Sequence, residues 1–316
     1  MIRMPGSSFQ GALPPLTEGE EGSRTRLEGD LFALAGEIGE RSFQNPTGLE
    51  AAATYIESAF KQIGYEVRPQ AYTHDGRTFR NLEAVLPGRG RSAEVVLLGA
   101  HYDTVPGSPG ADDNATGVAA ILELARMFKE EAFERTIRFV AFTNEEPPTY
   151  LTGAMGSRVY ARAARARNDR IVAMYSIESI GYYSDAPGSQ RYPSPLDHFY
   201  PDRGNFIGFV GNIRYGNLVR ESIAAFRKRT PFPSEGAAAP SWLPGISWSD
   251  HDSFWKEGYP AMMITDTVPF RNPHYHRPTD RPETVDTLRL ARVVHGLADV
   301  IRRIAQVEEK GGPSPP

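Results

Sequence analysis

The segment "HYDTVPGSPGADDNATG", residues 101–117, places one histidine and three aspartates among turn-forming Pro and Gly residues. It directly follows the apolar run "AEVVLLGA", which is typical of a buried strand. Imidazole and carboxylate groups can bind a metal, and the chain has no Cys to offer a thiolate instead. The segment is therefore a candidate metal site. Taken alone, it has a second interpretation, in which Asp112, Asp113 and Asn114 only form a loop and cap the following helix.

Acidic residues and a histidine also follow three further apolar runs, each of which is expected to be a strand. They are Glu145 and Glu146 after residues 136–144, Glu178 near the end of 170–179, and His276 after 260–267. Because the carboxyl ends of parallel strands meet at one edge of a sheet, these side chains are expected to lie together. Acids gathered in one crevice repel each other unless a cation neutralises them, so the pattern favours a metal site over chance clustering.

The types of ligand favour zinc. Two imidazoles with several carboxylates and no thiolate suit zinc best, with manganese and cobalt as weaker competitors. Five ligands exceed what one zinc ion needs, so we expect two ions bridged by a carboxylate. The pair "EE", residues 145–146, offers one carboxylate for the metal and one to move protons. A calcium site or a purely structural carboxylate cluster is the alternative, which the two histidines disfavour.

The segments that must position these residues alternate between helical and extended patterns. Apolar residues recur at helical spacing over 27–40, 48–64, 116–130, 156–167, 215–229 and 284–307. Strand-like runs occur at 65–73, 80–88, 94–100, 136–144, 170–179 and 260–267. This alternation predicts an α/β fold with a mixed, mostly parallel central sheet covered by helices on both faces.

A single domain is expected over residues 26–308, since 316 residues with 40% hydrophobic content can bury a sizeable core. Residues 1–25 and 309–316 are rich in Gly, Pro and charge and are predicted to be flexible ends. The segments at about 182–204 and 231–258 are rich in Pro, Gly, Ser and aromatic residues. We predict that they are long loops that wall the site.

Charge and hydropathy exclude several partners. The net charge is −4 and no basic cluster is present, so the chain is not expected to bind nucleic acid. No apolar run is long enough to span a bilayer, and the amino terminus lacks the apolar centre of a secretory signal. We therefore expect no membrane partner and a cytoplasmic location, with a processed secreted form as the alternative.

Five motifs resemble, in order, the dinuclear zinc exopeptidase family. They are "GAHYDTV", "PGADDNATG", "NEEPP", "SIESIGYY" and "YHRPTDRPETVD". That family includes bacterial leucyl aminopeptidases, glutamate carboxypeptidase and the transferrin receptor ectodomain. The likeness runs from about residue 28 to residue 305. It implies a three-layer α/β/α sandwich, two zinc ions per chain, and hydrolysis of a terminal peptide bond of the substrate.

The resemblance also implies a role for each matched residue. It implies that His101 and Glu178 bind the first zinc, that Glu146 and His276 bind the second, and that Asp113 binds both. Asp103 would orient His101, and Glu145 would be the general base. Tyr275 would either donate to the substrate oxygen or only pack under the site. The peptide bond between Asp113 and Asn114 is expected to be cis.

Two positions leave the assignment open. Glu178 stands where many members of the family have aspartate, and Asp185 is the alternative ligand. His274 lies beside His276, which is preferred because it directly precedes "RPTD". Three further candidates in "SWSDHDSFW" are expected to form loop structure and substrate wall instead of binding metal; they are Asp250, His251 and Asp252.

Three other functions on the same fold compete with an aminopeptidase. A carboxypeptidase would need an arginine for the terminal carboxylate, drawn from Arg203, Arg214, Arg271 and Arg277. A glutaminyl cyclase would use one zinc ion, and a non-catalytic binding protein would have lost ligands. The acid-rich site and the full ligand set favour the aminopeptidase.

Overall fold

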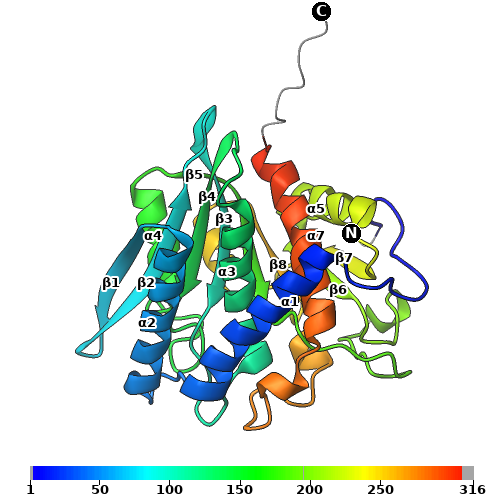
Figure 1. Ribbon diagram of the computed structural model, residues 1–316, viewed down its shortest axis with the longest axis horizontal. Helices are drawn as coiled ribbons and strands as arrows, with labels where there is room; N and C mark the ends of the chain where they lie inside the picture. Colours follow the sequence, from blue (N-terminus) through cyan, green and yellow to red (C-terminus); the bar gives the residue numbers. More distant parts are fainter. Residues whose placement is uncertain (1–2, 195, 308–316) are drawn as a thin grey trace, which may run out of the picture.

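The computed structural model describes residues 3–194 and 196–307, and it contains one sheet between two layers of helices (Figure 1). The expected α/β/α sandwich is therefore confirmed. The helices are α1 (Glu18–Leu31), α2 (Pro46–Ile63), α3 (Thr116–Phe128), α4 (Gly156–Ala166), α5 (Gly216–Arg229), α6 (His251–Lys256) and α7 (Thr287–Ala305). The strands are β1 (Val67–His74), β2 (Arg77–Leu86), β3 (Arg91–His101), β4 (Arg135–Phe142), β5 (Arg170–Glu178), β6 (Ile207–Asn212), β7 (Ser234–Ala239) and β8 (Ala261–Thr265).

The eight strands form a mixed sheet in the order β1-β2-β4-β3-β5-β8-β6-β7. The central strands β4, β3, β5 and β8 are mutually parallel. Strand β6 runs antiparallel to β8, and β7 is parallel to β6. At one edge of the sheet, the carboxyl ends of the four central strands therefore lie beside the amino ends of β6 and β7.

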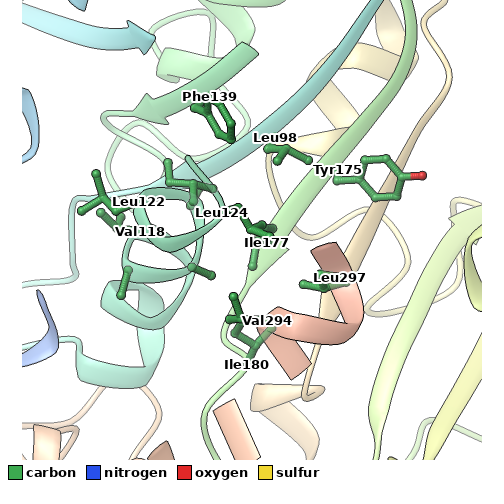
Figure 2. Close-up of a cluster of buried hydrophobic side chains, with 14 of the residues drawn as sticks. Leu98, Val118, Leu122, Leu124, Phe139, Tyr175, Ile177, Ile180, Val294 and Leu297 are labelled. Carbon is green, nitrogen blue, oxygen red and sulfur yellow. The ribbon is translucent and has the colours of Figure 1, made fainter. Parts of the chain in front are cut away.

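The central strands are apolar on both faces because helices cover both. Along β3, Val96 and Leu98 belong to the larger core cluster, which includes residues of α3 and α7. Their neighbours Val95 and Leu97 belong to a second cluster with residues of α4 and α6. Figure 2 shows part of the first cluster, where Leu98 lies between Phe139 of β4 and Tyr175 of β5; side chains of α3 and α7 belong to the same cluster. A strand buried on both faces needs a continuous apolar run instead of an alternating pattern.

The region after β5 contains more regular structure than the sequence predicted. Strand β6 was not expected, and β7 and α6 lie inside 231–258, so the prediction of a continuous loop there was wrong. The β7 sequence "SEGAAA" has low strand propensity. Its six residues are held by pairing with β6, a contact that local sequence does not encode. Segment 182–204 contains, among its described residues, only one short 3-10 turn, Leu196–His198.

The described part of the amino-terminal segment packs against the domain. Helix α1 begins at Glu18 with a capping box formed by Thr17 and Glu20. Upstream, the backbone N–H of Ser234 donates to the Ser8 hydroxyl at 2.9 Å. This segment, which was predicted to be a flexible end, therefore contains helix α1 from Glu18 and a contact between Ser8 and β7. The predicted flexible tail, 309–316, lies outside the described residues. Among the described helices, none is long and apolar enough to cross a bilayer.

Candidate metal centre

The structure brings the five predicted ligands together in two groups that share one residue. The ligand atoms of His101, Asp113 and Glu178 all lie within 4.8 Å of one another, and the same holds for Asp113, Glu146 and His276. The two oxygens of Asp113 face opposite ways: Oδ1 lies 3.3 Å from Nε2 of His101, and Oδ2 lies 3.1 Å from Nε2 of His276. A carboxylate placed in this way is suited to bridge two ions.

Strand ends and the turn before α3 position these groups. His101 and Glu178 are the last residues of β3 and β5, and Glu146 lies in the loop after β4. The Asp280 carboxylate accepts the backbone N–H of Asp113 at 3.1 Å. The following peptide bond, from Asp113 to Asn114, is cis, as expected.

Asn114 and Asp112 support this turn without joining either group. The side-chain oxygen of Asn114 accepts the N–H of Gly117 at 3.1 Å and that of Ser179 at 2.9 Å. Asp112 accepts the backbone N–H of Gly181 at 2.9 Å. Asn114 therefore binds a backbone N–H in the first turn of α3, while Asp113 enters the cluster.

The carboxylate of Asp103 binds the backbone of the neighbouring loop and not the His101 ring. Its two carboxylate oxygens accept the backbone N–H groups of Glu145 and Glu146, each at 3.0 Å. Nδ1 of His101 lies 3.1 Å from the Asp103 carbonyl oxygen but 3.8 Å from its nearest carboxylate oxygen. Asp103 was predicted to orient His101, and its carbonyl, more than its carboxylate, directs Nε2 of His101 toward Asp113 and Glu178.

Ser249 supports Glu178, and sequence reasoning did not identify it. The Ser249 hydroxyl donates to Oε2 of Glu178 at 2.6 Å, and it lies 2.9 Å from the Ser176 hydroxyl. All three side chains are buried. The sequence pointed to Ser249 only indirectly, because "SWSD" lies in a segment that was expected to form a wall of the site.

Burial and mutual repulsion make this cluster electrostatically strained. Burial, with the charge of Asp113 adding to the shift and a hydrogen bond with His276 opposing it, raises the pKa of Glu146 to about 8. Burial lowers the pKa of His276, but hydrogen bonds to Asp113 and Glu146 outweigh it and raise this pKa to about 10. Burial also raises the pKa of Asp113, but hydrogen bonds from both histidines hold it below its usual range. Bound cations would relieve this repulsion between carboxylates.

Glu145 lies beside the ligand groups without belonging to either among the described residues. Its side chain is buried, and burial raises its pKa well above the usual range, with Glu146 and Glu178 adding to the shift against the opposing effect of His101. A buried carboxylate of high proton affinity beside a metal site is suited to accept and return a proton.

The alternatives to the predicted ligands face elsewhere. Nδ1 of His274 lies 3.0 Å from the Thr279 hydroxyl, so His276 is the histidine that reaches the carboxylates. Asp185 accepts hydrogen bonds from Asn205 and Arg289 near the surface. Neither His274 nor Asp185 belongs to a ligand group found in the described chain.

The residues of "SWSDHDSFW" do not join the ligand groups either. Nε2 of His251 lies 2.8 Å from the Ile246 carbonyl, and burial lowers the pKa of this histidine to about 4. Asp252 pairs with Arg158 at 3.1 Å and with Lys256 at 2.9 Å. Asp250 is fully buried and neighbours the cluster without entering it.

A cavity of about 110 Å³ adjoins the cluster at Glu178 and Tyr275. The Tyr275 ring stacks on that of His276 with centroids 3.7 Å apart. Burial, followed by the charge of Asp113, raises the pKa of Tyr275, so its hydroxyl stays protonated and can donate. Among the described residues that line the cavity, none is Lys or Arg.

The arginines considered for a carboxypeptidase do not line this cavity. Arg271 is buried, and it donates to Gln190 and to the carbonyls of Tyr182 and Phe206. Arg203 donates to the Asp185 carbonyl near the surface. A dedicated clamp for a terminal carboxylate is therefore not found in the described part of the chain.

The donor set fits zinc. Each group offers one imidazole nitrogen and carboxylate oxygens, which are zinc's usual ligands in the absence of thiolate. Three protein ligands per ion leave a further position for water or substrate, as catalytic zinc sites require.

The chain is similar to known proteins in both sequence and fold. The chain is 36% identical over 289 residues to the uncharacterized protein YfbL of Escherichia coli, covering 88% of each chain. It is 27% identical to aminopeptidase YwaD of Bacillus subtilis, covering 80% of this chain and 50% of that one. The fold matches that of a zinc aminopeptidase from Bacillus subtilis with a TM-score of 0.71 at 15% identity, covering 91% of this chain and 95% of the other.

A glutaminyl cyclase from Fimbriiglobus ruber shares the fold with a TM-score of 0.64 at 17% identity, covering 93% of this chain and 97% of the other. The family model for peptidase family M28 matches residues 81–301, a region that contains both ligand groups and Glu145. The chain therefore belongs to peptidase family M28.

Proposed function

We propose that this chain is a dinuclear zinc aminopeptidase that removes residues one at a time from the free amino terminus of peptides. The sharing of Asp113 between two ligand groups carries this proposal, because it gives places for two ions. His101, Asp113 and Glu178 would hold one zinc, and Asp113, Glu146 and His276 would hold the other.

The charge around the site favours a substrate amine over a substrate carboxylate. The cavity beside the ligands has carboxylates in its wall and, among its described lining residues, no Lys or Arg. An ammonium group placed against buried carboxylates gains charge-assisted hydrogen bonds, whereas a terminal carboxylate would be repelled. This asymmetry supports an aminopeptidase over a carboxypeptidase.

Different side chains carry out different steps of hydrolysis. Bound zinc would polarise the scissile carbonyl and lower the pKa of a water molecule. Glu145 accepts the proton of the attacking water at its carboxylate and returns it to the nitrogen of the leaving amine. Asp103 fixes the backbone of Glu145 and so keeps this carboxylate beside the reacting atoms. Tyr275 is placed to donate its hydroxyl proton to the substrate oxygen.

The number of bound ions tests the dinuclear site. We expect the purified protein to carry two zinc ions per chain, as measured by elemental analysis. Chelation should abolish peptide hydrolysis and leave the far-ultraviolet circular dichroism spectrum in place, because the core is built apart from the site. A zinc-saturated protein with one ion per chain would contradict the dinuclear proposal and favour a cyclase.

Blocking the substrate amine tests the direction of cleavage. We expect peptides with a free amino terminus to be shortened from that end, and their N-acetylated counterparts to resist hydrolysis, because an amide cannot replace an ammonium opposite these carboxylates. Mass spectrometry of the products measures both. Release of carboxyl-terminal residues from the blocked peptides would instead identify a carboxypeptidase.

A further inference from the structure

The cavity beside the ligand groups contains a second carboxylate, which the proposed chemistry does not use. Glu178 lies at the end next to the metal ligands, and Glu235 of β7 lines the same cavity. These two glutamates are the charged residues among the described ones that line it. The remaining lining is mostly aromatic and aliphatic.

The two glutamates lie in one row across the sheet. Glu178 pairs with Thr265 of β8, Thr265 pairs with Gly208 of β6, and Gly208 pairs with Glu235. Directly paired residues project from the same face of a sheet, so Glu178 and Glu235 stand on the same side. Three strand spacings separate their backbones by about 14 Å. Thr265 and Gly208, both lining residues, form the floor between them.

The neighbours of Glu235 on β7 confirm the direction of its side chain. The Ser234 hydroxyl accepts a hydrogen bond from Nε of Arg227 on α5. At Gly236, an added Cβ would lie 3.1 Å from Ile223 of the same helix. Since successive residues of a strand alternate between faces, Glu235 points away from α5 and toward the cavity.

Glu235 is only partly neutralised by its neighbours. The nearest cation is Arg227, whose Nη2 lies 3.8 Å from Oε2, beyond hydrogen-bond distance. Arg227 instead donates to the carbonyls of Pro5, Gly6 and Ser234. Burial raises the pKa of Glu235, and Arg227 and a hydrogen bond with Ser8 oppose this shift. The carboxylate is therefore partly desolvated, with 24% of its side chain exposed, and it retains capacity for a further donor.

The aromatic residues near Glu235 give the cavity apolar walls. The rings of Tyr192 and Tyr200 stack with centroids 5.7 Å apart. Their hydroxyls donate to the carbonyls of Pro201 and Gly236, so they do not compete for the glutamate. A long aliphatic stem is accommodated by such walls, and aromatic faces also attract cations.

We infer that Glu235 ends a subsite for the side chain of the substrate's first residue, and that this subsite selects lysine and arginine. The inference rests on the proposed aminopeptidase activity. With the substrate amine and carbonyl at the Glu178 end, the stem of lysine or arginine lies along the floor of Thr265 and Gly208. Its cationic end then reaches the Glu235 carboxylate, whereas shorter side chains do not extend that far.

Neutral isosteres test this inference. We compare kcat/KM for lysyl and norleucyl dipeptides, and for arginyl and citrullyl dipeptides, using the zinc-loaded protein. A charge-assisted hydrogen bond favours each cationic residue over its isostere by about tenfold to a hundredfold. Glu235→Gln should remove this preference and leave hydrolysis of the norleucyl dipeptide within about twofold, since the amide keeps the shape of the carboxylate.

Glu221→Gln is the matched control. Glu221 lies on α5, about half exposed and 4.0 Å from Arg303, so this variant changes the net charge equally without touching the cavity. It should keep the preference for lysine. An equal loss in the control would assign the effect to long-range charge and overturn the inference. A uniform loss on all dipeptides in Glu235→Gln, with a lower unfolding temperature, would show a structural role and overturn it as well.

The outcome also separates this inference from the proposed function. Equal hydrolysis of lysyl and norleucyl dipeptides by the native protein would refute the subsite and leave the aminopeptidase proposal intact. If neither dipeptide is hydrolysed, calorimetric binding of lysine amide and norleucine amide decides. Tighter binding of lysine amide, lost in Glu235→Gln, would support the subsite while the proposed activity fails. Equal binding of the two amides would refute the subsite.

Discussion

Replacing Glu145 with Gln is expected to lower kcat by roughly two to four orders of magnitude while both zinc ions stay bound. The amide keeps the size of the side chain but cannot accept the proton of the attacking water. Glu145 belongs to neither ligand group in the described chain, so its neutralisation removes no ligand. Elemental analysis and steady-state kinetics on the same preparation measure both quantities.

Glu146→Gln provides the comparison within the same loop. Oε1 of Glu146 lies 3.1 Å from Nε2 of His276, within the second ligand group, so this variant should lose zinc as well as activity. Glu66→Gln, at a side chain that is 81% exposed, should change neither. If Glu145→Gln lost zinc and Glu146→Gln kept it, the two roles would have to be exchanged.

Replacing Glu178 with Ala is expected to release the first zinc. It should also lower activity more than the loss of a residue that only supports a metal ligand. The variant leaves only His101 and Asp113 in that group. Residues that merely support a ligand typically contribute about 10- to 100-fold in affinity or activity, and a direct ligand should exceed this range. Metal content per chain and kcat/KM measure the effect.

Glu178→Asp separates ligation from packing. It keeps the negative charge but shortens the side chain by one methylene, and Ser249 remains available to hydrogen-bond it. We expect this variant to retain zinc better than the alanine variant. Asp185→Ala, which removes an exposed carboxylate outside both groups, is the control and should keep two ions. Two zinc ions in Glu178→Ala would show that Glu178 only anchors its strand.

The central part of the sheet and the grouping of the candidate ligands followed from local sequence. Strand β3 is a continuous apolar run because helices bury both of its faces, and its last residue is His101. The same reasoning placed Glu178 at the end of β5. Parallel strands bring their carboxyl ends to one edge, so residue type and position were enough to predict which side chains meet.

The partners that orient these side chains were not encoded locally. Asp103 was expected to orient His101, and it does so through its carbonyl, while its carboxylate accepts two backbone N–H groups from the loop after β4. Ser249 reaches Glu178 from a loop 71 residues further along the chain. Contacts of this kind depend on how loops pack over the sheet edge, which apolar periodicity does not report.

Tertiary structure also decided the shape of the cavity. Strand β7, "SEGAAA", has small residues with low strand propensity, and only its pairing with β6 and packing against α5 make it a strand. That pairing aligns Glu235 with Gly208, Thr265 and Glu178 in one row. The sequence by itself determined the types of the candidate ligands and the strands that carry them, because burial on both faces and the order of motifs are local properties. The tertiary structure alone placed a second carboxylate in the same cavity, because strand register is fixed by hydrogen bonds between segments distant in sequence.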